Sequence, residues 1–338
     1  STLLKQIEEQ KETLKTQNGL ELTIAGLANT KKMIFSENGI NLGDWKSNLE
    51  SSSEVSESQL FVQKMIDMNL SNSIFIDNTA DSKIPDLYEK VFGASISVAT
   101  PNKVAASSAY DQYNLLKQSA KKNNVQFLFE TNVGAGLPVI STLRNLIHSG
   151  DRIIRIEAVL SGSVSFIFNN FDGGKPFSRL VTEAKELGYT EPDPRDDLSG
   201  ADVARKITIL AREAGYKVET SDVVIHPILP ERCLKAKDVD SFFEKLKEED
   251  SFFNGLLTNA KSESGVLRFI AKAEDGRISC GVEVVGHDSP FFNLGGSDNM
   301  IVFTTQRYKQ RPLVVRGPGA GAEVTAAGVF AEIISAGN

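Results

Sequence analysis

Residues 74–99, IFIDNTADSKIPDLYEKVFGASISVA, decide the fold class that the sequence predicts. Ile74–Asp77 and Ser95–Ala99 are short apolar runs typical of buried strands, and Ile84–Phe92 between them has apolar residues at helical spacing. A strand, a helix and a second strand in so short a stretch indicate two parallel neighbours joined by a crossover helix.

The same alternation extends over the first 136 residues. The other strands expected here are Leu22–Ala28 and Val125–Phe129, and the other helices are Ser1–Gln17, Leu60–Asn69 and Ser107–Lys122. Ser47–Ser58 is polar and rich in serine, so we expect a surface loop there. The pattern predicts an α/β fold in which residues 1–136 form a Rossmann-like domain with a helix-covered parallel sheet.

A Rossmann-like sheet normally begins with a strand and a glycine-rich turn, and this sequence begins with a helix. The first strand is central in the usual order, so its absence would leave buried donors and acceptors of its neighbours unpaired, at about 1–3 kcal/mol each. We therefore expect the natural protein to carry residues before Ser1 that supply this strand and turn.

The pattern changes after Gly134. Helices are expected over Leu137–Ile147, Phe177–Leu187 and Ser199–Ala214, and strands over Ile153–Leu160, Val266–Lys272, Ile278–Val285, Met300–Thr305 and Leu313–Val315. Short turns between neighbouring strands indicate a mostly antiparallel sheet with helices on one face. Residues 137–312 are therefore predicted to be a separate α+β domain with a mixed sheet. Arg316–Gly321 is expected to be a glycine-rich turn that opens a last helix, Ala322–Ile334.

The segment Thr190–Asp202, TEPDPRDDLSGAD, concentrates five carboxylates on a stretch stiffened by two prolines. Lys206 follows Asp202 by four residues, so the two side chains share one face of the predicted helix. Two interpretations stand. Ser199 and Asp202 form a capping-box-like helix start with an exposed ion pair, or the carboxylates bind a substrate ammonium while Lys206 transfers a proton to a nearby oxygen.

Composition excludes several classes of protein. The chain has 338 residues, 41% of them hydrophobic and 24% charged, and a formal net charge of −7, which argues against nucleic acid as a partner. No apolar run reaches the length of a membrane span. The two cysteines, Cys233 and Cys280, are expected to be reduced thiols in a cytoplasmic protein. The three histidines show no metal-ligand spacing.

Polar residues that follow the predicted strands are candidates for a nicotinamide cofactor. Asn29 and Lys31 follow the strand Leu22–Ala28, which ends with two lysines and no acid, a pattern that favours NADP(H) over NAD(H) or is simply a solvated turn. Thr79, Thr100 and Lys103 follow the next two strands, at the carboxyl edge where ligands bind in such sheets. Lys103 is also a second candidate for catalysis.

Six blocks of the sequence resemble homoserine dehydrogenases, and in particular the dehydrogenase portion of fused aspartokinase–homoserine dehydrogenases. The blocks are Gly39–Trp45 (GINLGDW), Thr100–Lys103 (TPNK), Thr131–Val139 (TNVGAGLPV), Leu160–Phe168 (LSGSVSFIF), Gly188–Lys206 (GYTEPDPRDDLSGADVARK) and Arg316–Phe330 (RGPGAGAEVTAAGVF). They span nearly the whole chain, and the fifth block is the most specific.

The resemblance implies reversible reduction of aspartate 4-semialdehyde to homoserine with NAD(P)H, on the route to threonine and methionine. It implies that Lys206 donates the proton to the carbonyl oxygen and that Lys103 is essential. By the same resemblance, Glu191, Asp197 and Asp202 are tied to binding the amino-acid end of the substrate, and Gly162 and Ser163 line the site. We expect Asp202 also to orient and support Lys206, because it lies four residues before the lysine.

The resemblance also implies features that no pattern in the residues suggests. A monovalent cation, Na⁺ or K⁺, is expected at Glu130, Val133, Ala135 and Leu137, mostly through backbone carbonyls. The glycine turn around Gly317 and Gly319 is expected to bind cofactor, so residues 313–338 are assigned to the nucleotide domain. A homodimer or higher homo-oligomer is expected, and an aspartokinase fused to the chain in the natural protein.

Two other functions remain open at this point. A non-catalytic regulatory or dimerisation module would explain the absence of a glycine-rich fingerprint, but the acidic segment and the two lysines argue against it. A semialdehyde dehydrogenase that forms an acyl phosphate would need a nucleophilic cysteine, and neither Cys233 nor Cys280 lies in a motif suited to that role.

Overall fold

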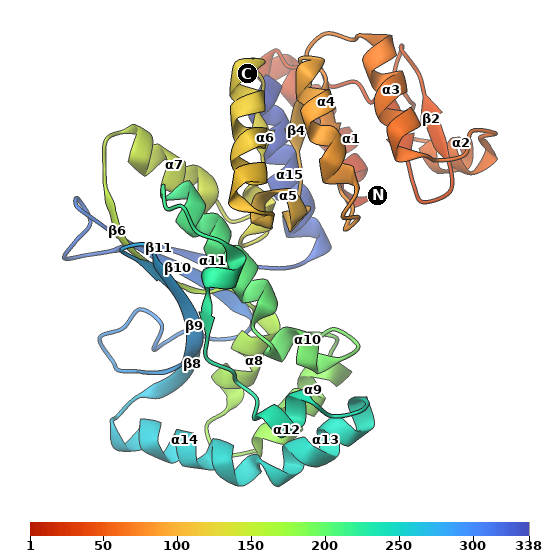
Figure 1. Ribbon diagram of the computed structural model, residues 1–338. Coiled ribbons are helices and arrows are strands. Elements are labelled where there is room, and N and C mark those ends of the chain that lie inside the picture. The colour runs from red at the N-terminus through yellow and green to blue at the C-terminus, as the bar shows by residue number, and fades with distance from the viewer. Residues whose placement is uncertain (338) are drawn as a thin grey trace. The chain divides into compact units, whose positions relative to one another are not determined.

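The computed structural model describes residues 1–337, which divide into two compact units. Of the described residues, the first unit contains 1–106, 111–132 and 322–337, and the second contains 107–110 and 133–321. Figure 1 shows the elements of both units. None of the helices within residues 1–337 is long and apolar enough to cross a membrane.

The first unit is built on a parallel sheet in the order β3-β4-β5, as the alternating pattern predicts. The strands are β3 (Ile74–Ile76), β4 (Ser97–Ala99) and β5 (Phe127–Leu128). The helices of this unit are α1 (Thr2–Thr13) with the π-helical turn η1 (Leu14–Asn18), α2 (Trp45–Ser51), α3 (Ser58–Met68), the 3-10 turn η2 (Ile84–Leu87), α4 (Tyr88–Gly93), α5 (Lys103–Ser107), α6 (Tyr110–Lys122), the 3-10 turn η3 (Glu130–Asn132) and α15 (Ala322–Gly337).

Alternation along β3 places its side chains on two faces of this sheet. Ile74 and Ile76 pack with the cluster that α1 and α15 build around Val329 and Phe330. Phe75 points the other way, and its ring lies 6.4 Å from that of Tyr88 in α4, between ring centroids. Helices therefore cover both faces, as expected for a parallel sheet.

Two expectations for this unit are wrong. The strand expected over Leu22–Ala28 is only β1 (Gly26–Ala28), and it pairs antiparallel with β2 (Met33–Phe35) instead of joining the parallel sheet. The side chain of Asn29 accepts hydrogen bonds from the backbone N–H groups of Lys31 and Lys32, which reverses the chain directly after β1. The serine-rich stretch is not all loop either, because Trp45–Ser51 forms helix α2.

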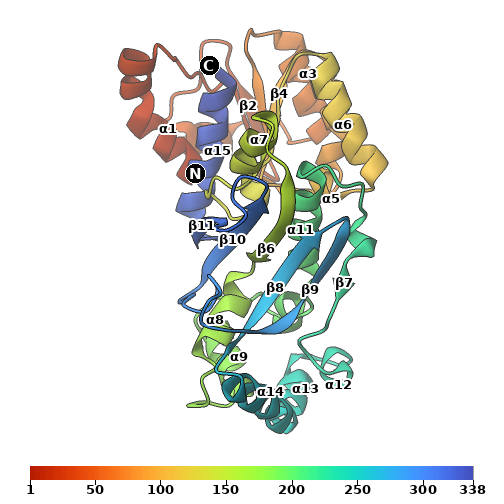
Figure 2. The same ribbon diagram turned by 90° about the vertical axis from the view of Figure 1, so that its left-hand side faces the viewer.

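The second unit is built on a six-stranded sheet in the order β11-β10-β6-β8-β9-β7. All its pairs are antiparallel except β7 with β9, so the sheet is mixed, as expected. The strands are β6 (Ile153–Val159), β7 (Val224–Ile225), β8 (Val266–Glu274), β9 (Arg277–Val285), β10 (Asp298–Thr305) and β11 (Leu313–Pro318). Figure 2 views this sheet from the face opposite α8 and α11.

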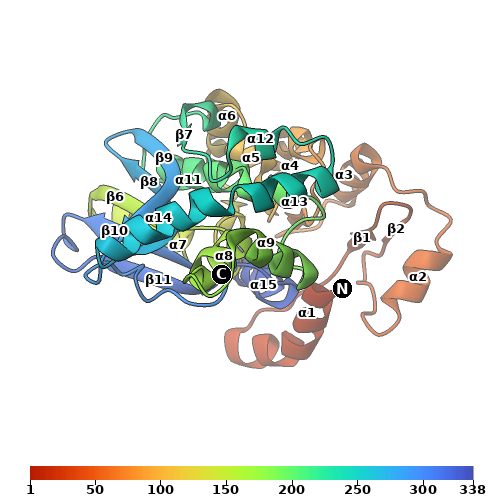
Figure 3. The ribbon, with the colours of Figure 1, turned by 90° about the horizontal axis from the view of Figure 1, so that it is seen from below.

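Helices of the second unit pack on one face and at one end of the sheet. They are α7 (Ile140–His148), α8 (Gly162–Asn170), α9 (Phe177–Glu186), α10 (Pro194–Leu198), α11 (Ala201–Glu213), the 3-10 turn η4 (Thr220–Asp222), α12 (Glu231–Leu234), α13 (Val239–Glu248) and α14 (Asp250–Ser262). Figure 3 shows α9, α13 and α14 side by side, and the rings of Phe177 and Phe253 stack between two of them at 3.8 Å between centroids.

Half of the glycine-rich segment before the last helix, Arg316–Gly321, is strand. Arg316, Gly317 and Pro318 belong to β11, which pairs with β10 in the six-stranded sheet. Residues 313–321 therefore lie in the second unit and not, as expected, with residues 1–136 in the first unit, which the last helix α15 rejoins. Gly319 is required by packing, because a Cβ there would lie 2.0 Å from the Cγ atom of Asn299.

Candidate active site

In the second unit the candidate site is centred on Lys206, in the second turn of α11. Its Nζ atom donates a hydrogen bond to the carbonyl oxygen of Leu160 at 2.7 Å and pairs with Oδ2 of Asp202 at 2.8 Å. Only 11% of the lysine side chain is exposed, compared with 47% of the aspartate side chain. The ammonium group is therefore fixed at the end of β6 and does not extend into bulk solvent.

The start of α11 differs from the expected Ser199 cap. Gly200 is the N-cap residue, with φ of +78°, and it has no side chain that could cap the helix. Ser199 Oγ accepts a hydrogen bond only from the backbone N–H of Ala201, at 3.2 Å. Asp202 lies in the first turn, where a carboxylate favours the helix dipole, but it is paired with Lys206 instead of completing a capping box.

Asp197 connects the acidic segment to the first turn of α8. Its Oδ1 accepts a hydrogen bond from Ser163 Oγ, and its Oδ2 accepts one from the backbone N–H of Glu191, each at 2.8 Å. Ser161 caps α8, and its Oγ lies 2.9 Å from that of Ser163. The structure thus brings together Asp197, Ser163 and the backbone of Glu191, three of the residues expected to bind substrate.

Not all carboxylates of the acidic segment are available to a ligand. Asp193 forms an ion pair with Arg195, Nη2 to Oδ2 at 2.5 Å, and caps the short helix α10. The hydrogen bonds from Arg195 lower the pKa of Asp193. Arg195 also donates to the carbonyl oxygen of Ala236, which ties the segment to the chain before α13. Asp193 and Arg195 therefore stiffen the segment, and Asp197 is the carboxylate that bonds to the first turn of α8.

In the first unit, a buried polar network lies at the carboxyl edge of the parallel sheet. Asp77 Oδ2 accepts hydrogen bonds from Tyr88 Oη at 2.6 Å and from Asn102 Nδ2 at 3.0 Å. Thr100 Oγ1 donates to the carbonyl oxygen of Asp77 at 2.8 Å, and Asn132 Nδ2 donates to that of Thr100 at the same distance. Burial and then the Asp77 carboxylate raise the pKa of Tyr88 well above its usual range, so its hydroxyl stays a donor.

This network positions two of the candidates from the sequence. The backbone N–H of Thr79 donates to Asp77 Oδ1 at 2.9 Å, and Lys103 is the first residue of α5, directly after Asn102. Tyr88, Asn102 and Asn132 were not among the sequence candidates. Their partners lie on other strands, and only the strand order shows that they meet.

The same edge has the chemistry that a nicotinamide ring would need. Within residues 1–337, Asn132 Oδ1 and Thr131 Oγ1 are buried without a hydrogen-bond partner. Unpartnered buried acceptors are costly, and an amide N–H group of a ligand would satisfy them. The residues present therefore fit a nicotinamide nucleotide at the position where ligands bind in open parallel sheets.

The remaining cofactor candidates lie in two other places. Asn29 forms the turn of the β1–β2 hairpin, where Lys31 is exposed and Lys32 Nζ donates to the carbonyl oxygen of Ser52 at 2.7 Å. Gly317 and Gly319 lie at the end of β11, where a Cβ on Gly317 would be 2.9 Å from Leu137 Cδ2.

The residues expected to bind a monovalent cation are divided between the units. Glu130 belongs to the first unit, where its backbone N–H donates to Glu332 Oε1. Val133, Ala135 and Leu137 belong to the second unit, in a turn closed by the Leu137 N–H bond to the Gly134 carbonyl oxygen and by φ of +52° at Ala135. Residues 1–337 contain no group of three His, Cys, Asp or Glu side chains arranged for a metal, so a cation here would depend on backbone oxygens.

Both thiols are unsuited to acyl-enzyme chemistry. Cys233 and Cys280 are free and buried. Burial raises the pKa of Cys233 and raises that of Cys280 to about 11, so neither forms an appreciable thiolate at neutral pH. The semialdehyde dehydrogenase alternative is therefore not supported, because it needs a reactive cysteine as nucleophile.

A polar network at the edge of a parallel sheet, with a fixed ammonium–carboxylate pair in a second α/β unit, is typical of nicotinamide-dependent oxidoreductases. Comparison with known proteins agrees. The family described as homoserine dehydrogenase matches residues 138–334, and the homoserine dehydrogenase NAD binding domain matches residues 1–130.

Similar proteins carry the same description. The chain is 43% identical over 335 residues to a chloroplastic bifunctional aspartokinase/homoserine dehydrogenase 2 of Zea mays, covering 98% of this chain and 36% of that protein. It is 40% identical over 342 residues to a homoserine dehydrogenase of Schizosaccharomyces pombe, covering 98% of this chain and 91% of that protein. A hyperthermophilic archaeal homoserine dehydrogenase in complex with NADPH superposes with a TM-score of 0.73 at 26% identity, covering 99% of this chain and 93% of that one.

The chain belongs to the homoserine dehydrogenase family. It spans well under half the length of the bifunctional relatives that it matches, 36% in the maize protein and 41% in that of Haemophilus influenzae.

Proposed function

We propose that the protein catalyses the reversible NAD(P)H-dependent reduction of aspartate 4-semialdehyde to homoserine. The observation that carries this proposal is the Lys206 ammonium group, held between the Leu160 carbonyl oxygen and Asp202. Family membership supports the same reaction, and the buried thiols remove the main enzymatic rival. The non-catalytic alternative has no support from the comparisons, since the NAD-binding domain matches residues 1–130.

The chain's own residues would act on the proton and on the amino-acid end of the substrate. Lys206 Nζ donates a proton to the oxygen that develops from the aldehyde, and its charge stabilises that oxygen beforehand. Asp202 keeps the ammonium oriented. Asp197 and Glu191 bind the substrate ammonium group, with Gly162 and Ser163 shaping the adjoining surface. When bound, the nicotinamide cofactor supplies the hydride.

We assign the cofactor contacts to three places in the chain. Thr79, Thr100 and Lys103 contribute from the carboxyl edge of the sheet, and Lys103 is the second candidate for catalysis. Gly317 and Gly319 have no side chains and so allow the cofactor to approach their backbone closely. Asn29 and Lys31 favour NADP(H), because the exposed lysine suits a 2′-phosphate and the hairpin turn has no acidic residue for a ribose hydroxyl.

Four further features are part of the proposal. A Na⁺ or K⁺ ion is bound by backbone oxygens of Val133, Ala135 and Leu137 and by Glu130. The chain forms a homodimer or a higher homo-oligomer, and it is joined to an aspartokinase in the natural protein, as the bifunctional relatives in maize and Haemophilus influenzae are named. The free cysteines favour a reducing, cytoplasmic compartment.

The test is homoserine-dependent reduction of NADP at alkaline pH, run beside NAD and beside a sample without homoserine. We expect NADPH to form only with homoserine, and faster than NADH forms under the same conditions. A folded chain that binds NADPH but forms none in this assay would refute the proposed reaction.

A further inference from the structure

The segment 286–297, between β9 and β10, is held by one arginine side chain of β8. Arg268 Nε donates to the carbonyl oxygen of Phe291 at 3.0 Å. Its Nη2 donates to the carbonyl oxygens of Phe292 at 3.0 Å and Leu294 at 3.1 Å. Three backbone oxygens of one irregular segment thus depend on a single guanidinium group.

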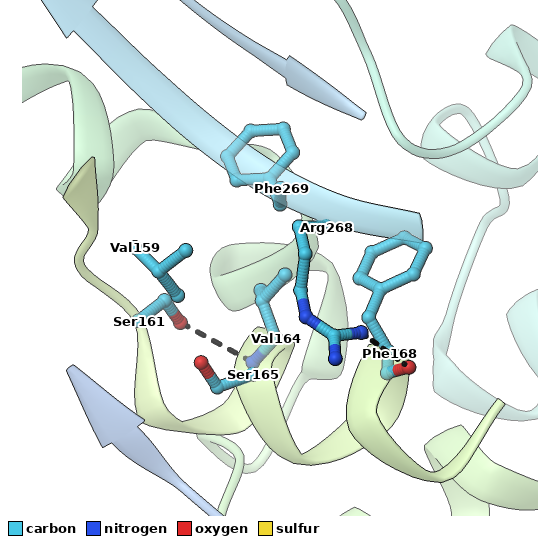
Figure 4. A pocket seen from close by; sticks show the side chains of 7 residues that line it. All are labelled: Val159, Ser161, Val164, Ser165, Phe168, Arg268 and Phe269. Carbon is cyan, nitrogen blue, oxygen red and sulfur yellow. Dashed lines mark hydrogen bonds between the residues drawn. The ribbon is translucent and has the colours of Figure 1, made fainter. Parts of the chain in front are cut away.

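The same guanidinium group reaches helix α8. Arg268 Nη1 donates to the carbonyl oxygen of Leu267 at 2.8 Å and to that of Phe168 at 3.4 Å. Figure 4 shows Arg268 extending from β8 toward the part of α8 that carries Phe168, beside Ser165 and Val164. Phe168 lies near the C-terminal end of the helix, where carbonyl oxygens lack helical partners and a positive charge is favoured.

Burying the charged guanidinium group of Arg268 in this space is unfavourable in free energy. The residue is only 6% exposed, and no carboxylate in residues 1–337 pairs with it. Burial alone lowers its pKa to about 10, so the group stays charged at neutral pH. An apolar side chain would avoid the cost of a buried charge, and it could not connect the segment to the helix.

The segment that Arg268 holds also lies along α8 through other contacts. Asn169 Nδ2 donates to the Gly296 carbonyl oxygen at 2.7 Å, and directly after the segment Ser165 Oγ donates to that of Asp298, the first residue of β10, at 3.1 Å. At the first residue of the helix, a Cβ on Gly162 would lie 3.3 Å from the Ser297 carbonyl oxygen. The segment therefore borders α8 from its last turn to its first.

We propose that Arg268 is a positioning residue for substrate binding, which fixes segment 286–297 against α8 and so holds Ser163 in its hydrogen bond to Asp197. The inference rests on the proposed function, because Ser163 and Asp197 are assigned there to the substrate. Arg268 touches no reacting group. It acts through the first turn of α8.

The test compares Arg268→Met and Arg268→Lys with Arg277→Met, an exposed arginine of the neighbouring strand β9. We expect Arg268→Met to raise KM for homoserine about tenfold and Arg268→Lys to raise it less, with the dissociation constant for NADPH unchanged. Arg277→Met should match the wild type. Because KM does not depend on the fraction of active protein, a variant that is merely less stable would keep the wild-type KM below its unfolding temperature. A folded Arg268→Met enzyme with a wild-type KM for homoserine would overturn the proposal.

A second variant decides the matter if Arg268→Met does not fold. Asn169→Ala removes one bond between α8 and the same segment at a less buried position, and we expect a threefold or so increase in KM for homoserine. Backbone hydrogen exchange gives a readout that does not need activity: Arg268→Lys and Asn169→Ala should speed exchange in 291–297 and in α8 and leave the first unit unchanged. Unchanged exchange in both segments would contradict the inference about Arg268, whether or not the wild type is active on homoserine. Inactivity of the wild type on homoserine would count against the proposed function alone.

Discussion

Lys206 acquires its position from two relationships, only one of which is visible in the sequence. The spacing of four residues from Asp202 places both side chains on one face of α11, and this could be predicted. The bond from Lys206 to the Leu160 carbonyl oxygen joins residues 46 positions apart, and only the packing of α11 beside the end of β6 reveals it. The first relationship is compatible with an ordinary surface ion pair. The second relationship shows a fixed ammonium group, which an ordinary surface ion pair does not have.

A substitution of Asp197 tests the proposed substrate site by changing a single carboxylate. Asp197→Asn removes the charge that Ser163 Oγ and the Glu191 N–H group contact, and hydrogen bonds to charged groups contribute about 1.5–3 kcal/mol. We expect KM for homoserine to rise about tenfold or more while the affinity for NADPH stays the same. Steady-state kinetics and NADPH titration measure the two effects separately.

The matched control for Asp197 is its neighbour in the same short helix. Asp196 is exposed, and Asp196→Asn makes the same chemical change one position away. If the two variants had equal KM values, general electrostatics of the acidic segment would explain the result and a specific role for Asp197 would be lost.

At the scale of the element, α11 depends on how it begins. Gly200 joins α10 to α11 with φ of +78°, and a Cβ there would lie 3.1 Å from Cζ of Phe269. Gly215, after the other end of α11, has φ of +97° with no atom within 4 Å of its Cβ position. Alanine at either site incurs the left-handed backbone cost of about 1–2 kcal/mol. Gly200→Ala should cost about 1 kcal/mol more than Gly215→Ala, because it also crowds the core.

Denaturant unfolding of the two glycine variants measures this difference directly. Equal losses of stability would mean that Phe269 moves aside without cost, and that backbone conformation alone requires glycine at position 200.

A substitution in the turn of the β1–β2 hairpin tests the proposed preference for NADP over NAD. Lys31 is exposed in its turn, whereas Lys32 is engaged with the Ser52 carbonyl oxygen. Lys31→Glu should weaken NADP binding about fivefold, the upper range for an exposed ion pair, and should leave NAD binding unchanged. Lys46→Glu, an exposed lysine of α2, is the control. Equal loss of NADP and NAD affinity in Lys31→Glu would assign the lysine a role other than 2′-phosphate recognition.

Elements with strong local signals could be predicted from the sequence, and those fixed by side-chain chemistry could not. Strands β3, β4, β8 and β10 could be predicted because each is a short apolar run. Helix α8 was missed because its sequence, GSVSFIFNN, starts with glycine and carries a Phe- and Ile-rich run that suits a strand equally well. The only local signal is Ser161 as N-cap before that run. The hairpin after Ala28 was missed because its turn depends on the Asn29 side chain.

At the scale of the whole molecule, the sequence indicates the chemistry of the site better than its supports. Lys206, Asp202, Asp197 and Ser163 were named from the acidic segment and from family resemblance. The buried network of Asp77, Tyr88 and Asn102 and the guanidinium of Arg268 were not. Their partners lie on other strands or are backbone carbonyl oxygens, which leave no pattern in a sequence. The position of the boundary near Gly321 could not be predicted either, because Arg316–Pro318, the second half of β11, is typical of a glycine-rich turn until its pairing with β10 is known.

The proposed reaction depends on one fixed ammonium group, that of Lys206, transferring the proton while a nicotinamide cofactor carries the hydride. The most direct measurement is the turnover of homoserine oxidation by the wild type and by Lys206→Met, each with saturating NADP and with NADPH affinity determined in parallel. We expect Lys206→Met to lose about a hundredfold in kcat, the usual scale for losing a general acid or base, with unchanged affinity for NADPH. A Lys206→Met enzyme that binds NADPH normally and keeps most of its turnover would contradict the account.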